Sequence, residues 1–550
     1  MKIINIKKPF AMQIQYQYIV PIFALVLFAF NTQAQSDLPT SEVEVVKQFE
    51  ARLIDSKRIP IDPVSEEEIK SEKEFRYSVE DHTEELTYDA PEIKPLGYRA
   101  GDGPDTYGGY LKAGAGYPLN YLVQGGYNFF INQSVQANVF GDVRGLQDHE
   151  VEGREAMNID FKGDLNFYTD VGLKINTYAG FATDHYTYYN PVGEIIDSSL
   201  NVDKVKYNDF TLGANINNFE ENDFGIDYSV AVEGKFLKSN FAQSDNTFNL
   251  YGNVHKKFGD KWLASLNLNS FNDIYDDGTK HKQNYFEFNP YIQFSSGNFK
   301  IKGGVLLLSS GEDAGVKPDV EIEYSLLDSR LNIFAGATGK YKINSMRSLI
   351  HENPFVDHVF DSLTLSNIND YYAGVKGSMT GINYNLRGGF RSIENLAIFQ
   401  ITNEDPYPLY APIFENAKNI YAELSVSMPI LDKLNIYSLI RYDNYDMEEI
   451  EKAWYIPSTK VQLGGKYGLL DGRLNLGLEF SYLSAVPHPE NEFEVPNAVF
   501  DVNLNGEYLF TESFGAFIQF NNLADSRYIR WQNYQGLGIN VLGGLSIRFK

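Results

Sequence analysis

Alternation of apolar and polar residues, repeated in segment after segment, constrains the fold of this 550-residue chain more than any other feature. The segment NIYAELSVSM places apolar side chains from Ile420 to Met428 on one face, and Tyr421, Glu423 and Ser425 on the other. The segment RLNLGLEFSY, residues 473–482, repeats the pattern. About ten residues is the length of a tilted strand that crosses a lipid bilayer. A long series of such segments therefore predicts strands that span a membrane.

The connections between these segments alternate between short and long. The short ones read INQS, EEND, FGDK, SSGN, LLDSR, MTG, LLDGR and FTES, whereas NDIYDDGTKHKQ, residues 344–365 and residues 394–418 are longer and more polar. Outer-membrane barrels have short periplasmic turns and long extracellular loops. We therefore predict an all-β fold over residues 105–550, a closed transmembrane antiparallel β-barrel of about 22 strands. A soluble propeller or sandwich would not explain the two-sided difference in loop length.

The last strand also indicates closure. In VLGGLSIRFK, Leu545, Ile547 and Phe549 alternate with small or polar residues and should face lipid. An unprotected amphipathic strand at the end of a soluble protein would leave an open edge, whereas in a barrel it pairs with the first strand. In this ending the chain resembles outer-membrane proteins generally. The resemblance implies that Leu545, Ile547 and Phe549 form the signal that the barrel-assembly machinery recognises. The usual signal ends on the aromatic residue, but here Lys550 follows it.

Aromatic residues near strand ends form girdles at the two surfaces of the membrane in barrels of this kind. Tyr437, Tyr442 and Tyr482 are expected to belong to them. Lipid and lipopolysaccharide are therefore expected partners of the outer face.

The N-terminus has the pattern of an exported protein. Lys2, Lys7 and Lys8 precede the apolar stretch YIVPIFALVLFAF, and NTQAQS with Ala34 follows it. This order predicts a cleaved signal peptide over residues 1–34 and delivery to the outer membrane of a Gram-negative cell. An N-terminal anchor helix is the alternative, but the apolar run is short for a membrane span.

Composition excludes several classes of function. The chain has no cysteine, which rules out disulfides, thiolate chemistry, cysteine-ligated metal and a lipidated N-terminal cysteine. Its formal net charge of −26 argues against nucleic acid as a partner, because phosphates require a basic surface.

Residues 35–104 differ from the rest and are predicted to form an acidic, largely extended periplasmic arm. Val43, Val46, Phe49 and Leu53 have the spacing of the apolar stripe of a short helix, which is a candidate binding surface for a periplasmic partner. The alternative is that EVEVV, residues 42–46, stays extended and pairs with a partner as an added strand.

The stretch FIQFNNLADSRYIRWQNY near the C-terminus carries Asn522, Leu523, Asp525 and Tyr528, with Tyr534 ahead of the closing strand. In these residues it resembles the end of the barrel in TonB-dependent outer-membrane receptors, most of all their Bacteroidota members. The turns LLDSRLNI and LLDGRLNL, and more loosely ILDKLNIY, are similar to the periplasmic turns of the same barrels. The resemblance covers about residues 106–550 and implies transport or uptake across the outer membrane.

The chain departs from that family ahead of the barrel. Family receptors carry a folded plug there, and energised transport works by pulling on it, whereas this chain has only the acidic arm. The resemblance is thus to a receptor barrel without its plug. EVEVV superficially resembles the short Val-rich box that pairs with TonB.

No motif for catalysis or for cofactor binding stands out, so neither an enzyme nor a metal or cofactor site is predicted. Asp273, Asp276 and Asp277 in DIYDDGTK are the nearest approach to a Ca²⁺ loop, but they lack the alternating carboxylates and closing glutamate of an EF-hand. His351 and His358 fall in one expected loop and are interpreted as solvated.

Two functions remain open on the sequence alone. In the first, the barrel passes a nutrient or polymer, through a lumen that is either open or occluded by its loops or the arm. In the second, the barrel is an anchor in an envelope assembly, and the acidic arm recruits a periplasmic partner.

Overall fold

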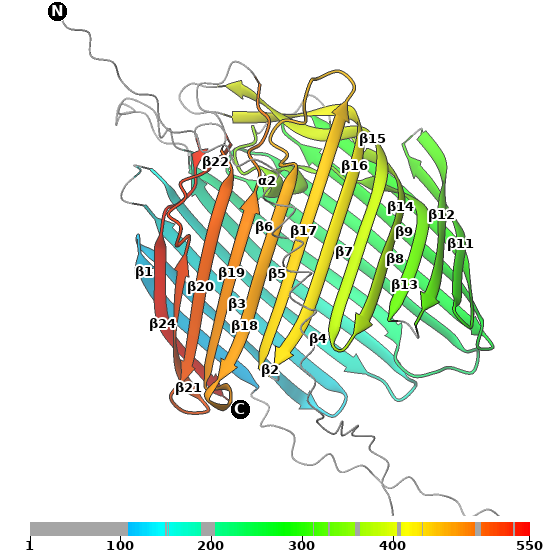
Figure 1. Ribbon diagram of the computed structural model, residues 1–550, viewed down its shortest axis with the longest axis horizontal. Coiled ribbons are helices and arrows are strands. Elements are labelled where there is room, and N and C mark those ends of the chain that lie inside the picture. The colour runs from blue at the N-terminus through cyan, green and yellow to red at the C-terminus, as the bar shows by residue number, and fades with distance from the viewer. Residues whose placement is uncertain are drawn as a thin grey trace, which may run out of the picture. The chain divides into compact units, whose positions relative to one another are not determined.

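A computed structural model describes residues 108–148, 151, 153–188, 204–311, 313–327, 330–357, 363–403, 409–431, 433–489, 497–531 and 534–549. All of them belong to one compact unit, Tyr98–Lys550 (Figure 1). The predicted signal peptide and the arm, with Val43, Val46, Phe49 and Leu53, lie outside the described residues.

Twenty-two antiparallel strands form one sheet that closes on itself. Their bounds are β1 Gly109–Tyr117, β2 Asn120–Asn132, β3 Val135–Gln147, β4 Glu155–Tyr168, β5 Leu173–Thr187, β6 Lys204–Asn218, β7 Ile226–Ser239, β8 Ser244–Phe258, β9 Trp262–Asp276, β10 Lys280–Ser296, β11 Phe299–Ser310, β12 Asp313–Leu326, β13 Leu331–Lys342, β14 Ser366–Met379, β15 Ile382–Asn403, β16 Leu409–Leu431, β17 Leu434–Met447, β18 Thr459–Leu469, β19 Leu474–Leu483, β20 Val499–Leu509, β21 Phe514–Asn521 and β24 Asn540–Phe549.

Closure is made by the first and last strands. β1 pairs with β2 on one side and with β24 on the other, in a register that sets Gly109 opposite Phe549 and Tyr117 opposite Val541. Figure 1 shows β24 beside β1, and each remaining strand of the barrel follows its predecessor around the wall. The predicted closed barrel of about 22 strands is therefore confirmed.

The described parts of the connections contain four short elements. The helix α2 (Met346–Glu352) follows β13, and the strands β22 (Ile529–Trp531) and β23 (Tyr534–Gln535) pair with each other between β21 and β24. The turn η3 (Leu470–Gly472) joins β18 to β19. Within the described part of the chain, no helix combines the length and apolar character needed to cross a membrane.

The two faces of the sheet follow the predicted alternation. Ile420 and Leu478 are exposed on the outside, whereas Tyr421, the neighbour of Ile420, is buried on the lumen side. Large apolar side chains are exposed along most strands, as expected for a surface that contacts lipid tails rather than water. Leu545, Ile547 and Phe549 are also on this outer face, as predicted.

Two of the expected long loops are instead mostly strand. NDIYDDGTKHKQ is the end of β9 and the start of β10, and only residues 277–279 lie between these strands. Residues 394–418 contain the ends of β15 and β16, which reach 22 and 23 residues. A hairpin can continue beyond the bilayer because its two strands still satisfy each other's backbone hydrogen bonds. Residues 344–365 do form a connection, and it contains α2.

One of the three tyrosines expected in the girdles faces the other way. The Tyr437 hydroxyl donates to Glu479 Oε2 at 2.8 Å on the lumen side, so Tyr437 does not contact lipid. Tyr442 is exposed on the outer face, and Tyr482 is paired there with the exposed Phe500. Tyr437 was misassigned because proximity to a strand end does not determine the face.

Candidate functional site

A tyrosine, a glycine and a glutamate on three adjacent strands recur on the lumen wall. Tyr178 lies opposite Gly213, which lies opposite Glu233, and the Tyr178 hydroxyl donates to Glu233 Oε2 at 2.9 Å across the glycine. The same arrangement, which we call a Tyr–Gly–Glu bridge, is formed by Tyr372, Gly336 and Glu321 at 2.7 Å and by Tyr437, Gly464 and Glu479 at 2.8 Å. In each bridge the tyrosine ring fills the space that a Cβ on the glycine would occupy.

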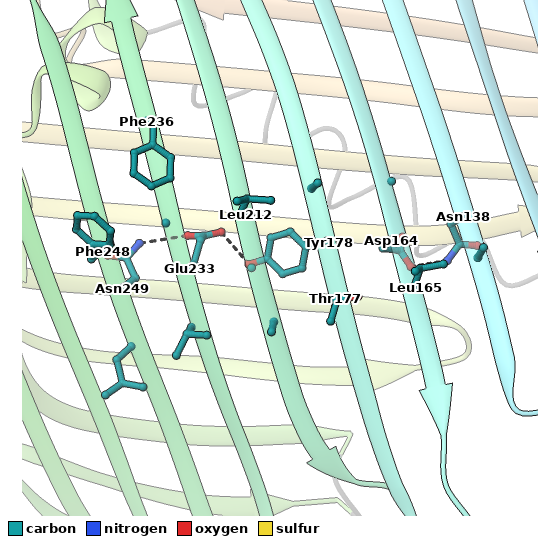
Figure 2. A pocket seen from close by; sticks show the side chains of 18 of the residues that line it. Asn138, Asp164, Leu165, Thr177, Tyr178, Leu212, Glu233, Phe236, Phe248 and Asn249 are labelled. Atoms are coloured by element: carbon teal, nitrogen blue, oxygen red, sulfur yellow. Dashed lines mark hydrogen bonds between the residues drawn. The ribbon is translucent and has the colours of Figure 1, made fainter.

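Figure 2 shows the first bridge within the wall of β3 to β9. Glu233 accepts a further hydrogen bond from Asn249 Nδ2 at 3.1 Å, so Tyr178, Glu233 and Asn249 form a bonded row across the strands. Leu165 and Leu212, which are exposed on the outer face, also line the hollow drawn there. The hollow follows the barrel wall, and its polar groups bond one another, so we interpret it as wall structure rather than a ligand site.

Arginines stack on tyrosines on the part of the lumen wall formed by β14 and its neighbours. The Arg387 guanidinium lies 3.8 Å from the centre of the Tyr372 ring, and that of Arg391 lies 3.9 Å from the centre of Tyr421. Both guanidinium groups also contact Asp370, at 2.8 and 3.3 Å. Planar guanidinium groups suit this combination, because they stack on aromatic faces while their edges donate hydrogen bonds.

Arg441 extends this cluster to β17. Its Nε and Nη2 atoms donate to the two oxygens of Asp443 at 2.6 and 2.8 Å, and its Nη1 donates to Glu423 at 2.9 Å. Such a bidentate pair fixes the guanidinium in one orientation. Three arginines and three carboxylates therefore make a polar, charge-balanced surface that faces the lumen.

At the extracellular end, connections and strand ends from opposite parts of the wall pack into one apolar cluster. We call this cluster the mouth lid. It consists of Tyr188, Val205, Tyr207, Leu237, Tyr275, Met346, Leu349, Val356, Ala397, Phe399, Tyr410, Tyr455, Val486, Trp531 and Tyr534. The ends of β5, β6, β7 and β9 contribute on one side and those of β15 and β16 on the other. Figure 1 shows α2 and β22 at this end of the barrel.

Trp531 is the centre of the aromatic contacts in the mouth lid. Its ring centre lies 5.3 Å from Phe399, 5.3 Å from Tyr410 and 5.1 Å from Tyr455. Aromatic pairs at such distances stabilise a structure by about 0.5–1.5 kcal/mol each beyond the area that they bury. Removing the indole would thus weaken contacts with β15, β16 and the connection after β17 at once.

Hydrogen bonds fasten the connection between β13 and β14 to the opposite wall. The Tyr186 hydroxyl donates to the Pro354 carbonyl at 2.7 Å, and the Arg347 backbone N–H donates to Asp245 Oδ2 at 2.9 Å. The Arg347 guanidinium forms an ion pair with Asp209 on β6. Burial lowers the pKa of Arg347 to about 10, which still leaves the group charged at neutral pH.

A cavity of about 1080 Å³ lies between this connection and the wall of β3 to β7. Charged groups of both signs line it, including Arg144, Asp184 and Asp209, and His351 and Phe355 border it from the connection. Cavities of about this size that combine apolar rings with a few polar groups are typical ligand sites. It is the candidate binding site of the molecule.

The structure gives a physical role to two of the residues that carry the family resemblance, Asn522 and Asp525. Asn522 has φ 50°, and its Nδ2 donates to the Leu537 and Ser526 carbonyls at 2.7 and 3.0 Å. Asp525 Oδ1 accepts the Ile539 N–H at 2.9 Å. These bonds tie the connection after β21 to the start of β24, so this motif shapes the loop that contributes Trp531 and Tyr534 to the mouth lid.

The structure describes two further groups of residues that the sequence singled out, those of the last strand and the carboxylates of DIYDDGTK. Leu545, Ile547 and Phe549 have the predicted orientation, while their reading by the assembly machinery stays a prediction. Among the carboxylates of DIYDDGTK, Asp276 and Asp277 accept the Gly278 and Thr279 N–H groups of the turn. In the described ranges no three His, Cys, Asp or Glu side chains are grouped to hold a metal ion.

Sequence reasoning missed the Tyr–Gly–Glu bridges, the stacked arginines and the mouth lid. Their members are far apart in the chain: Tyr186 and Pro354 are separated by 168 residues. The available signal was compositional, namely 38 Tyr and 45 Gly residues, and it could not say which tyrosine covers which glycine.

Comparison with known proteins finds structures with a similar fold but no match to the sequence. No family model and no curated protein matches the chain. Solved structures do match, among them the ferric-catecholate import receptor Fiu from Escherichia coli K12, with a TM-score of 0.62, 11% identity and coverage of 81% of this chain and 82% of that one. The siderophore receptor PirA from Acinetobacter baumannii matches with a TM-score of 0.63, 9% identity and 80% coverage of both chains.

The ferripyoverdine receptor of the outer membrane of Pseudomonas aeruginosa is also similar, with a TM-score of 0.60, 14% identity and coverage of 82% of this chain and 72% of that one. These neighbours are receptors rather than enzymes. The expected resemblance to the barrels of outer-membrane receptors is confirmed at the level of the fold. The region in which such receptors carry a plug lies outside the described residues here, so the lack of a plug stays a prediction.

Proposed function

We propose that this protein passes a solute across the outer membrane through its lumen, and that the mouth lid is the gate. The observation that carries the proposal is the lid itself, which joins the ends of β5, β6, β7 and β9 to those of β15 and β16 above a lumen lined with charged groups. A barrel of 22 strands encloses a lumen that needs an obstruction if it is not to be an open channel. Connections that fold over the mouth can provide one.

The cavity between the β13–β14 connection and the wall of β3 to β7 is where the solute would bind before passage. Its lining combines guanidinium, carboxylate and aromatic groups, which favours a polar solute with hydrogen-bonding groups over an apolar one. The matched structures are named as receptors for ferric-catecholate, for ferripyoverdine and for siderophores. They support uptake as the class of function, and we propose no enzymatic activity.

The scaffold alternative rests on the arm, residues 35–104. We retain a periplasmic partner for Val43, Val46, Phe49 and Leu53 as a proposal, but no contact among the described residues favours an anchor over a conduit. Conductance separates the two functions, since an anchor has no need of a lumen that opens.

The experiment compares the single-channel conductance of three full-length proteins in a planar bilayer. Trp531→Ala removes the ring at the centre of the mouth lid. For a core tryptophan this change lowers the free energy of unfolding by about 3–5 kcal/mol. Trp262→Ala is the matched control, because Trp262 is exposed on the outer face at the periplasmic end of β9. Folding of each variant is checked by the heat-modifiable electrophoretic mobility typical of barrels.

We expect little or no conductance from the natural protein and from Trp262→Ala, and large steps from Trp531→Ala. Large steady conductance of the natural protein would show that the lid does not close the mouth. Silence of a correctly folded Trp531→Ala protein would contradict passage through the lumen and leave the anchor function.

A further inference from the structure

Four oxygen-bearing side chains lie together on the lumen face of β8, β9 and β10. Thr247 on β8 is directly opposite Asp273 on β9, and Asp273 is directly opposite Gln283 on β10. Asp245 precedes Thr247 by two residues and therefore points to the same face. Directly opposed residues have Cβ atoms about 4.5–5.5 Å apart, so these side chains converge on one region.

This region is far more buried than a water-filled lumen wall would be. The exposed fractions are 0% for Asp245, 1% for Asp273, 2% for Thr247 and 7% for Gln283. The first turn of α2 lies against it, since the Arg347 N–H donates to Asp245 Oδ2. Water is therefore not available to solvate the two carboxyl groups as it would be on an open wall.

Several polar atoms in the region have no hydrogen-bond partner, namely Thr247 Oγ1 and both the oxygen and the nitrogen of the Gln283 amide. The carboxyl groups of Asp245 and Asp273 contact each other. Nearby on the same wall, Glu233 has three donors, so the lack of partners at Thr247 and Gln283 is not a general property of the lumen.

Each cationic side chain near the region has a carboxylate partner outside it, although Nε and Nη2 of Arg347 make no hydrogen bond. Arg347 pairs with Asp209, and Lys235, which is opposite Thr247 on β7, pairs with Glu233 at 2.9 Å. On the next strand, His281 is paired with Asp277 at 3.5 Å. Two buried carboxyl groups in contact thus lack a protein cation, although unpaired buried charge is strongly unfavourable.

We propose that Asp245, Asp273, Thr247 and Gln283 bind a hard divalent cation of the Ca²⁺ type, which ties α2 of the mouth lid to the barrel wall. Two carboxylates neutralise one divalent ion. The Thr247 hydroxyl and the Gln283 carbonyl oxygen add neutral ligands of the kind that Ca²⁺ accepts, and water can complete its usual six to eight oxygens. Thr247 and Gln283, both more than nine-tenths buried and unpartnered, distinguish this site from an ordinary pair of acids.

The competing explanation is a proton shared between Asp245 and Asp273, as in other close carboxyl pairs. It satisfies one contact but leaves Thr247 and Gln283 without partners. The two explanations predict opposite effects of calcium and of Asp273→Asn.

The test is a Ca²⁺ titration of the full-length protein after treatment with a chelator, in detergent at neutral pH. Calorimetry measures binding, and the trypsin cleavage rate after Arg347 reports the attachment of α2. We expect one Ca²⁺ per chain with a dissociation constant of about 10⁻⁵–10⁻³ M, and slower cleavage when Ca²⁺ is bound. Asp273→Asn and Thr247→Val should each weaken binding by tenfold or more.

Asp276→Asn is the matched control, because Asp276 is close in sequence but serves the turn through the Gly278 N–H at 3.1 Å. It should bind Ca²⁺ as the natural protein does. Thr247→Val keeps both carboxyl groups and guards against a folding defect of Asp273→Asn. The proposal is overturned if Ca²⁺ at 10 mM neither binds nor slows cleavage, or if Asp273→Asn and Thr247→Val bind as tightly as the control. Stabilisation by Asp273→Asn without Ca²⁺ would instead establish the shared proton.

Discussion

At Gly213 a side chain on another strand determines which residue can occupy the position. A Cβ at Gly213 would overlap the Tyr178 ring, which the bond to Glu233 holds in place. We therefore expect Gly213→Val to displace the ring and to lower the free energy of unfolding by about 1–3 kcal/mol, the range for overpacking. The urea midpoint of the refolded protein measures this loss.

A double-mutant cycle makes that expectation specific. In a Tyr178→Ala background the same Gly213→Val change should cost much less, because the ring is gone. Gly303→Val is the control, since no atom lies within 4 Å of a Cβ at Gly303. Equal losses in both backgrounds would mean that Gly213 is needed for some reason other than Tyr178.

Substitution of Arg441 measures how much the arginine cluster on the lumen wall contributes to the stability of the barrel. Arg441→Ala leaves Asp443 and Glu423 without their guanidinium partner, and because lumen water reaches part of the group we expect a loss of about 2 kcal/mol. Arg144→Ala breaks a pair with Asp142 in which the arginine is mostly exposed, and it should cost less than about 1 kcal/mol. Urea midpoints of the two variants measure the difference, and similar losses would contradict a structural role for the cluster.

At this scale the sequence predicted faces but not partners. Alternation placed Ile420 outside and Tyr421 inside, because the period of a strand is two residues. It could not predict that Tyr421 stacks on Arg391, since that contact depends on the register of β15 against β16. Tyr437 was assigned to the wrong face for a related reason, because its role comes from Glu479 two strands away.

The closing strand is the element in which assembly and stability can be separated. Phe549 on β24 stacks on Tyr127 of β2 at 5.4 Å, across Gly109 of β1, so the pair spans the closure of the barrel. Phe549→Ala removes both this contact and the terminal aromatic of the predicted assembly signal. Tyr127→Ala removes this contact and the stacking of Tyr127 on Phe129, but leaves the terminal aromatic in place.

If Phe549 is read during assembly, Phe549→Ala should reduce the amount of protein in the outer membrane several-fold, whereas Tyr127→Ala should reduce it little. Immunoblots of outer-membrane fractions measure the amounts. The midpoint temperature of thermal unfolding of the purified proteins should fall by a similar amount in both variants. Equal reductions in amount would assign the effect to the stacked pair and not to a signal.

The connection after β21 can be dissected through Asn522. Asn522→Gly removes the side-chain hydrogen bonds but tolerates the positive φ, whereas Asn522→Ala removes the bonds and adds strain of about 1 kcal/mol. Trypsin cleavage after Arg527 and Arg530 should therefore be faster in both variants and fastest in Asn522→Ala. The same rate in both variants would mean that φ is relaxed by the neighbouring residues.

Elements of the barrel were predictable because each strand carries its own alternation and its own turn. The outer ends of β15 and β16 were taken for a loop, since polar residues there indicate exposure to water and not the loss of pairing. α2 and β22 were unpredictable for a deeper reason. They are held by the apolar contacts and hydrogen bonds of the mouth lid more than by local propensity, and a helix of seven residues is marginal by itself.

On the scale of the whole molecule, strand number and closure followed from the even count of segments and from the last strand. The mouth lid did not follow, because it forms where several connections meet. The lid nevertheless changes what is expected of the N-terminal arm. A lumen that is closed at its extracellular end does not need an obstruction at the periplasmic end.

Deletion of the arm, residues 35–104, therefore should not by itself produce conductance in a planar bilayer. Combined with Trp531→Ala, the deletion should leave the single-channel conductance of the Trp531→Ala protein unchanged, because the lid alone controls the mouth. Conductance from the deletion variant with an intact lid would show that the lid leaves a path open and that the arm blocks it. Larger steps in the combined variant than in Trp531→Ala would mean that arm and lid obstruct the lumen in series, each limiting the flow of ions.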